Sequence, residues 1–360
     1  MTIDFNETDK YFEINFLNEE KPHSLLLDLY FNPAKILGDY FEKIFPRDIE
    51  YQKNHALIPY TVDFIEWNGW LFRGHKDAGW KLETSFERLI HNRTIFKNDF
   101  EIETDRTKFR DYFEIEMGMI REFRRKVFEY APHLKSLREE DYYEWIANMQ
   151  HYGCKTRFLD VTFSFFVALY FAVESIEFSK VNEDSKKGMF TIWFFNRMWI
   201  EKRYKDFLPS EIMDLYNKYD QFGKDVRIQD KVLNYVPDLK EQKKEFKDAF
   251  KTVINMTPYY LNERLVRQKG SFLVPTNPYC SFEENLFNMI KDKNDIFRII
   301  KVNVEYNDKS LLYMLKFLDE MNNTSSVLFN SIEGLCKNIN YKSLLPNDSI
   351  IISPNKGIKS

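Results

Sequence analysis

The sequence is poor in cysteine and glycine. Its 360 residues include only 3 Cys and 11 Gly. The three cysteines, Cys154, Cys280 and Cys336, lie far apart and form no Cys-x-x-Cys pair. This pattern excludes a disulfide framework and a zinc site of the usual spacing. Because so few cysteines suit a reducing compartment, we expect a cytoplasmic protein.

An excess of charge of one sign and a long hydrophobic run are also missing. The net charge is −4 with 30% charged residues, whereas a general nucleic-acid binder would show a basic excess. The longest uncharged run, residues 161–173, is too short for a membrane span, which needs about 20 residues. Residues 1–20 lack the basic and apolar pattern of a secretory signal. We therefore expect no membrane partner.

What the sequence does contain is apolar and aromatic. Hydrophobic residues make up 44% and aromatic residues 17%, enough for a full core and too much for global disorder. The length allows one elaborated domain or two at roughly 150 residues each. We expect a helical N-terminal elaboration over residues 1–60 and an α+β domain over 61–340. This domain carries a charged helical insertion at about 198–255, and residues 341–360 form a tail.

The spacing of apolar residues predicts helices and short strands in irregular alternation. The predicted strands cover residues 67–73, 189–195, 272–274 and 296–304. The predicted helices cover residues 24–45 with a break near Pro33, 107–130, 139–149, 161–175, 309–321 and 326–338. This alternation favours an α+β fold with one mixed sheet of short strands and helices around it. Residues 161–175 are apolar on nearly every side, which predicts a buried helix with Asp160 or Thr162 as its N-cap.

Three stretches crowd polar side chains beside apolar runs: Trp70–Gly74, Gln150–Asp160 and Arg267–Phe272. Each contains a glycine, which lets the backbone approach a neighbour closely. Burying such polar groups without partners costs about 1–3 kcal/mol each, and a polar pocket would explain the cost. We therefore expect four side chains to converge on one cleft: Arg73, Arg157, Asp160 and Gln268.

Each of these side chains also has a purely structural interpretation. Arg73 either holds a phosphate or carboxylate through its guanidinium fork or is clamped by an acid such as Asp160. Asp160 either caps a helix, orients Arg157 or binds a ribose hydroxyl. Gln268 either offers its amide to a ligand or satisfies a turn. His151 lacks a nucleophilic partner in the sequence, which favours a structural histidine over an acid–base group.

Together the three stretches resemble the FRG domain, a bacterial and phage family named for its Phe-Arg-Gly signature. The resemblance rests on WLFRG at 70–74, QHYG at 150–153, TRFLDVT at 156–162 and ALYFA at 168–172. It extends to Arg264, to QKGSF at 268–272 and to short matches at 326–329 and 333–335. Cys154 and Lys155 replace the more usual Leu-Pro of the family, and Val161 replaces a usual Trp.

A weaker resemblance is to the ADP-ribosyltransferase plan, which implies an ADP-ribosyltransferase-like core and NAD as substrate. By this resemblance Arg73 holds the dinucleotide, and Gln268 stands where that plan has a glutamate. A neutral amide cannot offset the charge of a ribosyl cation, and electrostatic stabilisation is usually the largest catalytic contribution. The resemblance implies catalytic roles for Arg73 and Gln268 and a nicotinamide pocket shaped by Thr162 and Ser164, and we expect Asp160 as a further catalytic candidate. We also expect nucleotide-binding roles for Arg73, Gly74, His151, Thr156, Arg157, Thr162, Ser164 and Arg264.

Two hypotheses follow from the sequence. In the first, an intracellular FRG-domain protein binds NAD or a related nucleotide. It then transfers ADP-ribose to a protein or nucleic acid, or cleaves NAD, as a toxin or phage-defence effector. In the second, the same pocket belongs to a non-catalytic nucleotide-sensing or protein-interaction module. A carboxylate within reach of Arg73 discriminates between them, and the candidates are Asp160, Glu263 and Glu83. No metal site is predicted.

Overall fold

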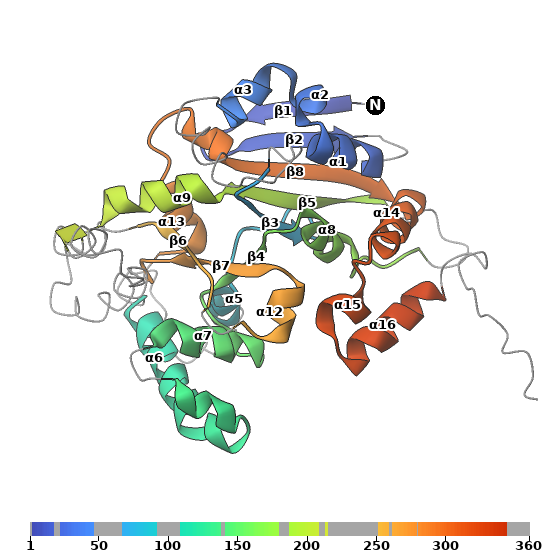
Figure 1. Cartoon of the computed structure of the whole chain (residues 1–360). Helices are drawn as coiled ribbons and strands as arrows, with labels where there is room; N and C mark the ends of the chain where they lie inside the picture. The colour runs from blue at the N-terminus through green and yellow to red at the C-terminus, as the bar shows by residue number, and fades with distance from the viewer. Residues whose placement is uncertain are drawn as a thin grey trace, which may run out of the picture.

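A computed structural model describes residues 2–17, 22–46, 67–91, 109–137, 141–179, 187–208, 213–214, 251–258, 261–278 and 280–343. Within these residues one open sheet of eight strands has the order β1-β2-β8-β5-β3-β4-β7-β6 (Figure 1). The strands are β1 Thr2–Glu7, β2 Phe12–Leu17, β3 Trp70–His75, β4 Leu159–Thr162, β5 Lys187–Asn196, β6 Val253–Met256, β7 Gly270–Pro275 and β8 Ile299–Asn307. β2 and β8 are parallel and the other neighbours are antiparallel, so the predicted mixed sheet with surrounding helices is confirmed.

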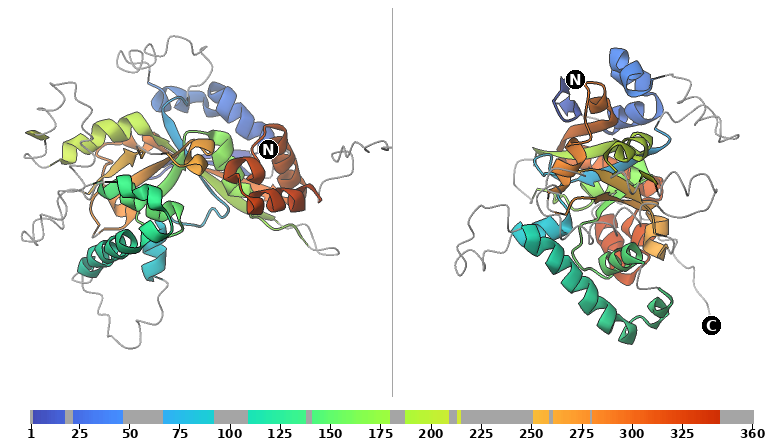
Figure 2. Two further views of the ribbon diagram at one scale, coloured as in Figure 1. Left: turned by 60° about the horizontal axis from the view of Figure 1, so that its bottom comes forward. Right: turned by 90° about the vertical axis from the view of Figure 1, so that its left-hand side faces the viewer.

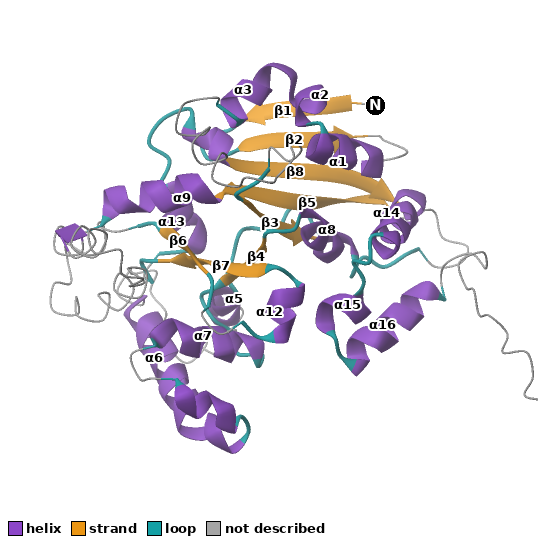
Figure 3. Cartoon of the chain, in the orientation of Figure 1, coloured by secondary structure: helices purple, strands orange, loops and turns teal. Residues whose placement is uncertain are grey.

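The helices agree with most of the predicted ones (Figure 3). They are α1 Pro22–Phe31, α2 Pro33–Leu37, α3 Phe41–Ile44, α5 Ser85–His91, α6 Phe109–Lys126, α7 Tyr142–His151, α8 Phe165–Val173, α9 Arg197–Arg203, α12 Glu263–Arg267, α13 Phe282–Phe287, α14 Asp308–Glu320, α15 Ser325–Phe329 and α16 Ile332–Lys342. The predicted helix at 326–338 is two helices, α15 and α16. The chain turns between them at Asn330, whose φ of 43° is left-handed.

Helices cover both faces of the sheet (Figure 2). Successive residues of a strand point to opposite faces, and β3 illustrates this alternation. Leu71 packs in one buried cluster with side chains of α7 and α13. Phe72 packs in the other with side chains of α1, α8 and α14. The strand that carries the Phe-Arg-Gly sequence is therefore buried on both sides and lies between β5 and β4.

Gly74 allows α8 to pack directly on β3. A β-carbon at this position would lie 2.0 Å from the carbonyl oxygen of Ala168 and 2.6 Å from the amide nitrogen of Ala172. Both atoms belong to the backbone of α8, which cannot move aside as a flexible side chain would. The close approach expected at this glycine is therefore present, and the neighbour is a helix backbone.

The start of the buried helix differs from the prediction. Residues 159–162 form β4, which pairs with β7 from Leu159 to Thr162, and α8 begins only at Phe165. The N-cap is Ser164, whose side chain accepts a hydrogen bond from the Val167 amide at 3.4 Å. The expectation that Asp160 or Thr162 caps the helix is therefore wrong. The long-range pairing with β7 decides this, because an apolar run alone suits a strand or a buried helix.

The first residues of the chain are strands rather than helices. Phe12, Ile14 and Phe16 of β2 are buried, and β2 pairs in parallel with β8. The expected helical elaboration over residues 1–60 therefore begins with part of the sheet. Of the expected insertion at 198–255, α9 and the edge strand β6 are seen, and most of the rest lies outside the described residues. The predicted domain limits stay predictions.

Candidate functional site

A cavity of about 460 Å³ lies where β3 and β4 separate. These strands share a single register pair, Phe72 with Thr162, whereas β3 pairs with β5 at six positions. Side chains from β3, β4 and β7 line the cavity together with others from α5, α7, α8 and α12, which lie near these strands in Figure 1. The polar and charged lining residues are Arg73, Ser85, Arg88, Gln150, His151, Lys155, Asp160, Thr162, Asn262, Arg264, Gln268 and Ser271.

Arg73 bridges the gap between the two strands. Its Nη1 donates a hydrogen bond to the backbone carbonyl of Asp160 at 2.6 Å, and its Nε donates to Nε2 of His75 at 3.0 Å. The side chain thus supplies the link that the backbone ladder lacks beyond Phe72. Its remaining nitrogen, Nη2, forms no hydrogen bond with the described residues. The expected clamp exists, but Asp160 provides its carbonyl and not its carboxylate.

His75 is a buried histidine held in its neutral form. Burial and the nearby charges of Arg73 and Arg88 lower the pKa of His75 to about 2. Its Nε2 accepts from Arg73, so the ring proton lies on Nδ1. Burial also lowers the pKa of Arg73, to about 10, and the guanidinium stays charged at neutral pH. Sequence reasoning missed His75, although side chains two residues apart on a strand share a face.

The carboxylate of Asp160 is oriented by two further residues. Gln150 donates from Nε2 to Oδ1 of Asp160 at 2.6 Å. The Oε1 of Gln150 accepts a hydrogen bond from the hydroxyl of Thr156. Because the amide of Gln150 is engaged at both ends, its orientation is fixed. Thr156 was predicted to bind the nucleotide, but it is buried and does not line the cavity. Its hydroxyl reaches the site through Gln150, and its backbone exchanges hydrogen bonds with the hydroxyl of Ser85.

Thr162 and Gln268 line the cavity but also serve the fold. The Thr162 hydroxyl donates to the backbone carbonyl of Gln268 at 2.6 Å and accepts from the Ser164 amide at 3.0 Å. Gln268 donates from Nε2 to the carbonyl of Leu328 at 3.2 Å, which joins the end of α12 to α15. Ser164, predicted to bind the nucleotide, caps α8 and does not line the cavity.

The charged lining is strongly unequal. Among the described residues that line the cavity, four cations, Arg73, Arg88, Lys155 and Arg264, face a single carboxylate, that of Asp160. The other two candidate carboxylates do not line the cavity. Glu263 accepts from Arg267 at 2.7 Å and from Asn330 at 2.6 Å, and Glu83 offers its backbone carbonyl to Arg88 at 2.6 Å. Asp160 is therefore the carboxylate that shares the cavity with Arg73.

The comparison with protein families agrees with this arrangement. Residues 68–180 match the family model of the FRG domain. The chain carries an FRG domain. The match contains β3 with Arg73 and the segment from α7 through β4 to α8 with Asp160. Comparisons with curated proteins and with solved structures gave no match. The resemblance to the ADP-ribosyltransferases stays a prediction.

Arg157 was expected to line the cavity, but in the FRG domain it has a structural role outside it. It is buried outside the cavity, with Nε 3.2 Å from the Glu116 carboxylate on α6. Tyr142 donates its hydroxyl to the same Glu116 oxygen at 2.9 Å. The guanidinium also lies 6.0 Å from the Tyr142 ring centre. Arg157 thus attaches α6 and α7 to the segment before β4. The expected convergence holds for Arg73, Asp160 and Gln268 and fails for Arg157.

His151 and Cys154 both line the cavity of the FRG domain, but they do not form a pair of nucleophile and base. Burial and the charge of Arg264 lower the pKa of His151, which favours the neutral ring. Burial raises the pKa of Cys154, so its thiol stays protonated, and the side chain packs against the apolar cluster.

No group of residues suited to a metal ion occurs in the described part of the chain. No helix among the described residues is long and apolar enough to cross a bilayer.

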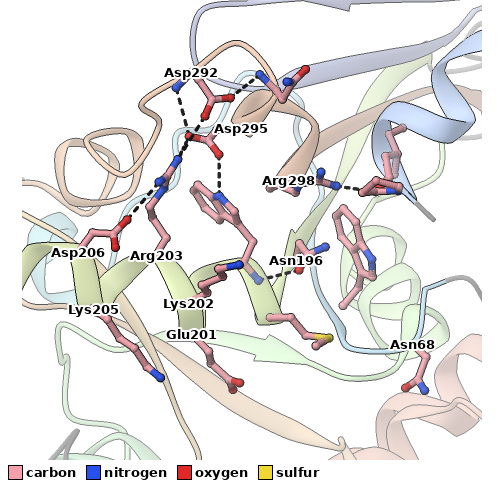
Figure 4. Close-up of a pocket in the computed structure, with 16 residues that line it drawn as sticks. Asn68, Asn196, Glu201, Lys202, Arg203, Lys205, Asp206, Asp292, Asp295 and Arg298 are labelled. Atoms are coloured by element: carbon pink, nitrogen blue, oxygen red, sulfur yellow. Dashed lines mark hydrogen bonds and ion pairs between the residues drawn. The ribbon is translucent and has the colours of Figure 1, made fainter. Parts of the chain in front are cut away.

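A second cavity, of about 610 Å³, has balanced charges (Figure 4). Arg203 of α9 pairs with Asp206 at 3.1 Å, with Asp292 at 3.6 Å and with Asp295. Trp199 donates from Nε1 to Asp295 at 2.9 Å. This network ties α9 to the turn that precedes β8. Four cations and four carboxylates line the cavity: Lys202, Arg203, Lys205, Arg298, Glu201, Asp206, Asp292 and Asp295.

Proposed function

We propose that the cavity of the FRG domain binds NAD or a related nucleotide. The chain then transfers ADP-ribose from it to a protein or nucleic acid, or hydrolyses the bond to nicotinamide. Such an activity suits a toxin or phage-defence effector. The observation that carries the proposal is that Arg73 and Asp160 line one cavity, each held in place by its own partner. The volume of about 460 Å³ lies within the roughly 300–1,000 Å³ common for small-molecule sites.

Cleavage of the bond to nicotinamide needs a carboxylate rather than an amide to stabilise the charge on the ribose. When the glycosidic C–N bond breaks, its electron pair leaves with nicotinamide and positive charge develops on the ribose. A preoriented carboxylate stabilises that charge, and the neutral Gln268 cannot. Water or the nucleophilic atom of the acceptor then bonds to the ribosyl carbon and releases a proton to solvent. We therefore give Asp160 the stabilising role and Arg73 the role of holding the nucleotide.

The second candidate is a non-catalytic nucleotide-sensing or protein-interaction module. It is favoured because several cavity residues already form hydrogen bonds within the protein. The amide of Gln268 already bonds Leu328, the hydroxyl of Thr162 already bonds Gln268, and one oxygen of Asp160 already bonds Gln150. A module that only binds a nucleotide needs the cations of the cavity and no free carboxylate.

Incubation with NAD, followed by mass spectrometry for free nicotinamide, separates the two. We expect release by the parent chain and a rate lowered about 100-fold or more in Asp160→Asn, because loss of one preorganised electrostatic group has effects of that size. Asp39→Asn, an exposed aspartate outside both cavities, is the matched control and should keep the parent rate. Calorimetric binding of NAD without nicotinamide release would support the non-catalytic module. The absence of both NAD binding and nicotinamide release would refute the proposed function.

A further inference from the structure

The cations of the FRG cavity divide into two kinds. Arg73 is anchored through two of its three nitrogens, by His75 and by the Asp160 carbonyl. Arg88, Lys155 and Arg264 are exposed, and none of them forms an ion pair with the described residues. They come from separate places in the sequence: α5, the segment after α7, and α12. The fold therefore gathers three uncompensated positive charges around one opening.

Contacts that exist at these cations orient them without neutralising them. Arg88 donates from Nη1 to the Glu83 carbonyl at 2.6 Å, and the guanidinium of Arg264 lies 4.9 Å from the Phe329 ring centre. Several other arginines among the described residues, such as Arg157 and Arg203, do pair with acids. Arg267, on the same helix as Arg264, pairs with Glu263 at 2.7 Å.

The positive field is also felt by neighbouring side chains. Burial is the main cause of the lowered pKa of both His151 and Arg73, and the charges of Arg264 and Arg88 respectively lower it further. The chain as a whole carries a net charge of −4, so the positive excess at this cavity is opposite in sign to the charge of the whole chain. A local excess of this kind attracts a small anion, whereas a long polyanion would need a basic surface.

We propose that Arg88, Lys155 and Arg264 form a subsite for the phosphate groups of a nucleotide, separate from the Arg73–Asp160 pair that faces its reacting end. The nucleotide as ligand rests on the proposed function, whereas the anion subsite rests on the charges. Arginine suits this task because its planar fork donates two parallel hydrogen bonds to phosphate oxygens, and lysine adds a point charge.

Calorimetry with ADP, pyrophosphate and adenosine tests the subsite directly. We expect ADP and pyrophosphate to bind with an affinity that falls as salt rises, and adenosine to bind much more weakly. Arg88→Gln, Lys155→Gln and Arg264→Gln should each weaken ADP binding about tenfold, since each removes a charge-assisted contact. Arg267→Gln lies on the same helix, outside the cavity, and should bind ADP like the parent. Melting curves confirm that each variant is folded.

The outcomes distinguish this inference from the proposed function. Equal ADP affinity in Arg264→Gln and Arg267→Gln, or adenosine binding as tight as ADP, would overturn the subsite. NAD cleavage with parent kinetics in the three cation variants would also overturn it and leave the proposed function standing. Cation-dependent ADP binding without nicotinamide release would retain the subsite and remove the catalytic function. A competition experiment compares a single-stranded oligonucleotide with unlabelled ADP as competitors for bound labelled ADP. Displacement by the oligonucleotide at the lower concentration would assign the cations to nucleic acid and overturn the proposal.

Discussion

Arg73 donates a hydrogen bond from Nε to Nε2 of His75 over 3.0 Å, along one face of β3. A protonated imidazole has no acceptor nitrogen, so this bond exists only while His75 is neutral. Burial and the neighbouring arginines enforce that state by lowering the pKa of His75 from 6.5 to about 2. The arginine of the family signature therefore depends on a histidine two residues beyond it.

The first prediction concerns the stability of the fold in acid. In the unfolded chain His75 takes up a proton below about pH 6.5, whereas in the folded chain it stays neutral down to about pH 2. Stability from this group is thus present above pH 6.5 and is lost as the pH falls, by at most about 1.4 kcal/mol per pH unit. His75→Gln keeps an acceptor for Arg73 but does not titrate. Urea unfolding from pH 7 to pH 4 should show the parent losing stability faster than the variant, and parallel curves would contradict the prediction.

Replacement of Arg73 by lysine should affect both stability and binding. Lysine retains the charge but cannot donate to His75 and to the Asp160 carbonyl at once. We expect a free energy of unfolding lowered by about 1–3 kcal/mol and much weaker nucleotide binding. Thermal melts and calorimetric titration with NAD measure the two effects. A variant that melts and binds like the parent would show that the fork geometry is dispensable.

Gly74 offers a test of the contact between β3 and α8. Gly74→Ala places a methyl group against the backbone of Ala168 and Ala172, and we expect a loss of about 1–3 kcal/mol or more because neither strand nor helix can yield. Gly118→Ala is the matched control. A β-carbon there has no neighbour within 4 Å, and alanine favours the helix α6 by about 1 kcal/mol. If Gly74→Ala unfolds at the same urea concentration as the parent, α8 does not pack on β3 as described.

The sequence was sufficient for features that depend on local pattern. The apolar spacing of α6 and α14 predicted both helices, and glycines beside polar groups marked the three stretches that line the cavity. The strands of residues 2–17 were missed although Phe12, Ile14 and Phe16 alternate with polar residues. That alternation was a readable signal for a half-buried strand.

Features that depend on distant partners could not be predicted in the same way. Arg157 has the composition of a ligand-binding residue, and only the fold shows that Glu116 of α6 is its partner. Similarly, β4 is defined by its pairing with β7, about a hundred residues later in the chain. The pairing of Gln150 with Asp160 is closer in sequence, but it requires the turn at Gly153, whose φ is 91°.

The last prediction concerns Thr156, a buried residue whose hydroxyl acts on the cavity through Gln150. Thr156→Val removes the hydroxyl that fixes the Gln150 amide and leaves a side chain of similar shape. Freed from this bond, the amide can rotate and present its oxygen to the Asp160 carboxylate, so Asp160 loses its fixed orientation. We expect nicotinamide release to slow about tenfold, less than in Asp160→Asn, because the carboxylate remains.

Thr156→Ser, which restores the hydroxyl, should recover most of the rate, and a merely structural role would not predict that recovery. Melting curves of the two variants control for stability, since Thr156 is buried. Equal rates in Thr156→Val and Thr156→Ser would show that Gln150 is held in place without this hydroxyl, and that the orientation of Asp160 has another cause.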